Sequence, residues 1–67
     1  MKQLRINLLN RAIFSLMEEI ENESGLMFHE YNQSLERRCM DVMASKNAAL
    51  LNMLIKDLEL IVQGFSK

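Results

Sequence analysis

Apolar residues that recur at intervals of three and four positions are the feature that most limits what this chain can form. Near the start, Ile6, Leu9, Ile13, Leu16 and Ile20 alternate these two intervals. That rhythm places the five side chains along one side of an α-helix. The sequence has no proline and only two glycines, so long helices meet few obstacles. We therefore expect an all-α protein.

The length and composition indicate one folded unit. A chain of 67 residues that is 49% hydrophobic is too apolar for a disordered tail and too short for two domains. Within a single helical domain over 1–67, we predict a helix over about 3–22, a turn at 23–26 and a second helix over about 27–63. Gly25 suits the left-handed conformation that ends a helix. Ser45 or Asn47 can cap a new helix, so a break at 45–47 is the alternative to a continuous second helix.

The lengths of these helices predict the architecture. A continuous second helix would be about 55 Å long and the first about 30 Å, so the first cannot cover the second. We therefore expect a helical hairpin with a short first and a long second helix, two copies of which form a four-helix arrangement. The alternative is a three-helix bundle broken near Ser45. The residues predicted to form the dimer interface are Leu50, Leu54, Leu58, Ile61 and Phe65.

The residues that could carry out chemistry are few and scattered. His29 and Cys39 are ten positions apart, nearly three turns of one helix, and a nucleophile must lie within hydrogen-bond reach of its base. One histidine and one cysteine are too few for the usual zinc sites. Gly25 and Gly64 stand outside any phosphate-binding motif. We expect no enzymatic activity, no metal and no cofactor.

Charge and hydropathy bear on location and on the class of partner. Eight Lys and Arg against nine Asp and Glu give a net charge of −1, which provides little attraction for phosphates. Polar residues interrupt every apolar stretch that resembles a secretion signal or a membrane span. An unpaired cysteine suits a reducing compartment. We expect a cytoplasmic protein with no membrane segment, for which nucleic acid is a minor alternative partner.

The surplus of apolar helix surface predicts binding to another protein, because so short a chain cannot bury all of it. Methionine suits surfaces that adapt to a partner. In size and pattern the chain resembles small bacterial helical-hairpin proteins that hold another protein in check. That resemblance implies an anti-activator of a transcription factor or a co-chaperone of secretion subunits. The predicted partner-binding residues are Ile13, Leu16, Ile20, Met40, Met43 and Met53.

A second reading starts from the alternation of polar and apolar residues between Gln3 and Leu8, a period of two that also fits a β-strand. A strand followed by two helices resembles the ribbon-helix-helix family of bacterial and phage repressors. In that family, paired strands place alternate side chains in the major groove. The resemblance implies that Gln3, Arg5 and Asn7 read DNA bases. A third reading is RNA binding through Arg37, Arg38 and Lys46.

Overall fold

The computed structural model describes residues 1–66, and within that range it contains four helices and no strand. In chain order they are α1 (Lys2–Ser24), α2 (Phe28–Tyr31), α3 (Gln33–Ser45) and α4 (Ala48–Phe65). The expectation of an all-α chain is confirmed.

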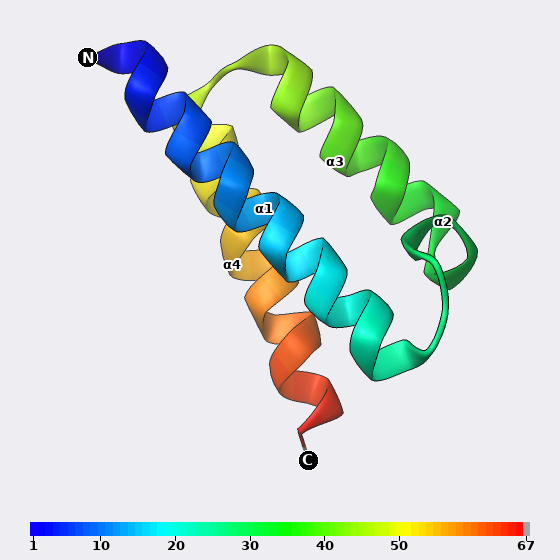
Figure 1. Cartoon of the computed structure of the whole chain (residues 1–67). Coiled ribbons are helices and arrows are strands. Elements are labelled where there is room, and N and C mark those ends of the chain that lie inside the picture. The colour runs from blue at the N-terminus through cyan, green and yellow to red at the C-terminus, as the bar shows by residue number, and fades with distance from the viewer. Residues whose placement is uncertain (67) are drawn as a thin grey trace.

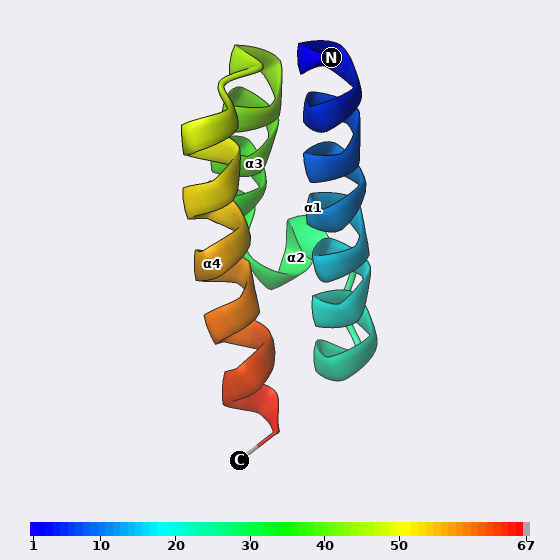
Figure 2. The ribbon, with the colours of Figure 1, turned by 90° about the vertical axis from the view of Figure 1, so that its left-hand side faces the viewer.

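α4 is the central helix of the arrangement. It packs along most of α1 and also contacts α3, whereas the single turn of α2 links α1 to α3. α1 and α3 make almost no direct contact with each other. Figure 1 shows α1 crossing in front of α4, and Figure 2 shows α1 on one side of the molecule with α3 and α4 together on the other.

The core joins the two ends of the chain. α1 contributes Ile6, Ile13 and Ile20, which are two turns apart, and all three are buried. Leu9 and Leu16 pack against the same cluster and are half-buried, so the apolar stripe predicted for the first helix is confirmed. The other buried members are Phe28, Leu35, Cys39, Leu51, Leu54 and Leu58.

Gly25 ends α1 as its position in the sequence predicts. Its φ is 76°, in the left-handed region, and its N–H donates to the carbonyl of Glu21 at 2.9 Å. A glycine takes this conformation without the steric penalty of a Cβ. The turn at 23–26 therefore lies where the sequence places it.

The prediction of a continuous second helix over 27–63 is wrong, because the chain breaks at Asn32 and again at Lys46. Lys46 adopts a left-handed conformation with φ 52° and ψ 30°. Beside it, the side chain of Asn47 accepts the N–H groups of Ala49 and Leu50 at 3.0 and 3.2 Å, which starts α4. Asn32 caps α3 in the same way through the N–H of Leu35 at 3.0 Å. The second break lies where the alternative architecture placed it, near Ser45.

The strand required by the ribbon-helix-helix reading is also contradicted. Residues 3–8 belong to α1, and the Gln3 amide donates to the Asn7 side chain four positions later at 2.9 Å, a helical spacing. Helix formation prevails here because it places Ile6 on the stripe that packs against α4.

Substitutions at two adjacent positions of α4 test which face forms the core. Leu54 is fully buried and Met53 is 59% exposed. Leu54→Ala is expected to lower the free energy of unfolding by about 2–5 kcal/mol, because a cavity is left behind. Met53→Ala is expected to change it by less than about 0.5 kcal/mol in the monomer. Urea denaturation followed by circular dichroism measures both, and equal losses would contradict the assigned core.

The cap of α4 is tested by Asn47→Ala. Two backbone N–H groups lose their acceptor, so we expect a loss of about 0.5–2 kcal/mol in the free energy of unfolding. Asn22→Ala, at an exposed position within α1, serves as the control and should change it by less than about 0.5 kcal/mol. If Asn47→Ala leaves the free energy of unfolding unchanged, the break at Lys46 does not depend on this cap.

Candidate functional site

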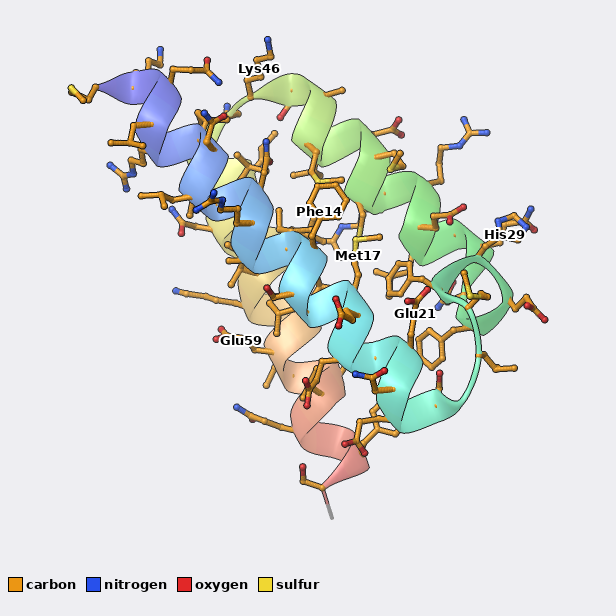
Figure 3. The ribbon with its side chains drawn as sticks, viewed as in Figure 1. Phe14, Met17, Glu21, His29, Lys46 and Glu59 are labelled. Atoms are coloured by element: carbon orange, nitrogen blue, oxygen red, sulfur yellow. The ribbon has the colours of Figure 1, made fainter. Side chains whose placement is uncertain are left out.

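A second stripe of α1 lies beside the one that forms the core. It comprises Asn10, Phe14, Met17 and Glu21, at intervals of four, three and four residues, and is called the Phe14 face below. Figure 3 shows the labelled Phe14, Met17 and Glu21 extending from α1 on the side where α2 and α3 lie. The Phe14 face therefore lies on the side of α1 that faces α3, and the backbones of these two helices do not come close to each other.

Glu21 fixes the end of this face. One of its carboxylate oxygens accepts the N–H of Phe28 at 2.7 Å, across the turn that joins α1 to α2. This bond gives the first residue of α2 an acceptor that the short helix cannot supply itself. It also accounts for an acidic residue in the last turns of α1, where the helix dipole disfavours negative charge.

Two groups on the Phe14 face lie in unfavourable surroundings, one apolar and one polar. The side chain of Phe14 is 57% exposed, although Met17 beside it packs against the core. The Oδ1 atom of Asn10, one turn earlier, is buried and accepts no hydrogen bond. An aromatic ring in water and an orphaned buried acceptor both disfavour the isolated state. A ligand that covers the ring of Phe14 would remove the first of these two costs.

Charges are segregated along the molecule. Residues 1–17 carry Lys2, Arg5 and Arg11 with no acid, whereas residues 18–36 carry six glutamates with no lysine or arginine. Lys46 lies near the start of α1, where it lines a shallow hollow together with Lys2 (Figure 3). The Phe14 face therefore runs from a basic end of the bundle to an acidic end.

The residues predicted from sequence to bind a partner or a second copy divide into three groups in the structure. Ile13, Ile20, Leu54 and Leu58 have no exposed side-chain surface and belong to the chain's own core. In this fold neither a partner nor a second copy can reach these four. Leu16, Met43, Ile61 and Phe65 are half-buried, and the exposed group is Leu50, Met40 and Met53.

Sequence reasoning missed Phe14. The residue lies outside the stripe of isoleucines, and its exposure depends on α3 standing clear of α1. The signal that was present is the regular spacing from Asn10 to Glu21, which marks a second and mixed stripe on the same helix.

His29 and Cys39 are not brought together. At the surface, Nδ1 of His29 lies 2.9 Å from Oε1 of Glu36, and Nε2 of His29 lies 3.5 Å from the side-chain nitrogen of Gln33. Cys39 is fully buried, and this burial raises the pKa of its thiol more than the nearby Arg38 lowers it. A neutral thiol in the core is a poor nucleophile. Within residues 1–66, no three His, Cys, Asp or Glu side chains cluster in a way that could hold a metal ion.

Comparison with known proteins gives no relative from which to transfer a function. No family model matches the chain, and no curated protein or solved structure is significantly similar to it. Among the described residues, no helix combines the length and the apolar character needed to cross a membrane.

The orphaned acceptor is tested by Asn10→Leu. Replacing a buried amide that lacks a partner with an apolar side chain of similar size is expected to raise the free energy of unfolding by about 1–2 kcal/mol. The shift in the midpoint of urea denaturation measures it, with Asn7→Leu at an exposed position of α1 as the control. A destabilised Asn10→Leu would show that the amide oxygen has a donor after all.

Proposed function

We propose that this protein is a non-enzymatic regulatory or chaperone-like protein that holds an amphipathic helix of another protein against its Phe14 face. The observation that carries the proposal is the 57% exposed ring of Phe14 beside the half-buried Met17 on α1. Aromatic side chains that a partner can bury are frequent anchors of protein interfaces.

The geometry of the face favours a helix as the ligand. Asn10 and Glu21 are separated by eleven residues, or about 17 Å along α1, which corresponds to about three helical turns. A helix laid beside α1 presents its own apolar stripe at the same spacing, so side chains of the two can interdigitate.

The charge distribution specifies the partner further. The end of the face near Glu18 and Glu21 belongs to the acidic segment 18–36, and the end near Arg11 belongs to the basic segment 1–17. A complementary helix would carry Lys or Arg at the acidic end and Asp or Glu at the basic end. Such charges speed encounter and fix orientation more than they add affinity.

Negative regulation of a transcription factor and escort of a secretion subunit both suit a protein that covers one helix of its client. DNA binding through Gln3, Arg5 and Asn7 is not proposed, because these residues lie on a helix and no strand exists there to enter a groove. A face this small supports an affinity in the range of about micromolar Kd.

The test places a photo-crosslinking phenylalanine analogue at position 14 in the native cell and identifies the attached protein by mass spectrometry. The attached segment is then synthesised as a peptide, and its affinity is measured by calorimetry. Phe14→Ala is expected to weaken binding by about thirtyfold, equivalent to about 2 kcal/mol, because the aromatic anchor is lost.

Leu8→Ala is the matched control, because Leu8 is 53% exposed on α1 but lies off the Phe14 face. Its affinity for the peptide should equal that of the unmodified chain. Equal binding by Phe14→Ala, or a peptide that is not helical when bound, would contradict the proposal. Crosslinks only to nucleic acid would replace it with the RNA reading.

A further inference from the structure

α4 has apolar side chains on two opposite sides, and the chain itself covers only one. On the uncovered side, Lys56 and Asp57 lie between Met53 and Leu60. Leu51, Leu54 and Leu58 are fully buried against α1 and α3. On the other side lie Met53, which is 59% exposed, and Leu60, which is 65% exposed. Ala49 and Gly64 extend the same stripe toward the two ends of the helix and are exposed as well. The four residues Ala49, Met53, Leu60 and Gly64 are called the Met53 face.

The Met53 face is complementary to itself when reversed. Its residues are arranged symmetrically about the midpoint between Lys56 and Asp57, with the two long side chains inside and the two small residues outside. If a second copy of α4 lies antiparallel about that midpoint, Met53 meets Leu60 of the second copy and Ala49 meets Gly64. A Cβ placed on Gly64 would touch nothing within 4 Å. The chain's own packing therefore does not require a glycine at this position, although glycine disfavours a helix.

The charges beside the face are also complementary. In an antiparallel pair related by a twofold axis, the same edge of each helix lies together. Lys56 and Glu59 share one edge and are both exposed, so Lys56 of each copy lies between Lys56 and Glu59 of the other, and the four charges on this edge sum to zero. On the other edge, Asp57 forms an ion pair with Arg38 of α3 at 2.6 Å. In the proposed pair this neutral ion pair lies beside the same ion pair of the second copy. Neither edge brings an uncompensated charge into the contact.

We propose that the partner for the Met53 face is a second copy of this chain, with the two α4 helices antiparallel about the midpoint between Lys56 and Asp57.

This self-association is independent of the function proposed for the Phe14 face, since the two faces lie on different helices. Sedimentation equilibrium of the full chain at about 100 micromolar is expected to give twice the 7.8 kDa mass of one copy. Leu60→Glu should raise the dimer Kd by at least about 100-fold, since two charges would enter the apolar stripe of each dimer. Circular dichroism should show unchanged helix content, because Leu60 is exposed in the single chain.

Leu8→Glu makes the same substitution at an exposed leucine on α1 and should leave the dimer intact. A second pair of variants tests the direction of the helices. Lys56→Glu alone is expected to raise the dimer Kd by about fivefold to thirtyfold, and the double variant Lys56→Glu with Glu59→Lys should restore it. A parallel pair would bring Lys56 beside Asp57 of the second copy, so Glu59→Lys would not restore the affinity.

The proposal is overturned if the unmodified chain sediments as a single copy at this concentration. It is equally overturned if Leu60→Glu remains dimeric while Leu8→Glu dissociates. Phe14→Ala should keep the dimer mass while losing the partner helix, so failure of this proposal and failure of the proposed function give different results.

Discussion

The packing of α1 against α4 is the interaction on which the rest of this molecule depends. Ile6, Ile13 and Ile20 near one end of the sequence meet Leu51, Leu54 and Leu58 near the other, and these six side chains make up most of the core. A chain of this length has a total stability of only about 3–10 kcal/mol. α2 and α3 add three buried residues, Phe28, Leu35 and Cys39. Glu21 and Asn32, whose side chains accept backbone N–H groups of α2 and α3, and the exposed ion pair of Arg38 and Asp57 add to this burial.

How far the sequence predicts this fold depends on the kind of signal. The stripe of α1 and the turn at Gly25 follow from periodicity and from the conformational freedom of glycine, and both are confirmed. The break at Lys46 does not follow from the sequence, because lysine is not a residue type that marks a left-handed backbone conformation. Asn32 and Asn47 were weak signals, since asparagine occurs both in caps and on solvated helix surfaces. Tertiary packing decided between these readings when it folded α4 back along α1.

The candidate sites were harder to predict for a related reason. α4 has apolar residues over most of its circumference, so helical spacing alone cannot separate Leu54 and Leu58, which are buried, from Met53 and Leu60, which are exposed. The side chains carry a hint that periodicity ignores. The buried side is made of leucines, whereas the exposed side mixes Ala, Met, Leu and Gly, a composition less suited to filling a fixed volume. Which side faces inward was fixed only by the position of α1.

The charges of α1 bear on why the two exposed faces differ. Basic residues at the start of a helix and acidic residues at its end oppose the helix dipole, so this order reduces the stability of α1. Glu21 is compensated by its bond to Phe28, but Glu18, Glu19 and Glu23 belong to no ion pair within the described residues. A fold with so small a core would not gain from such an arrangement. The field of these charges would orient the helix proposed to bind the Phe14 face. The edges of the Met53 face are neutral, which suits the proposed contact between two identical copies.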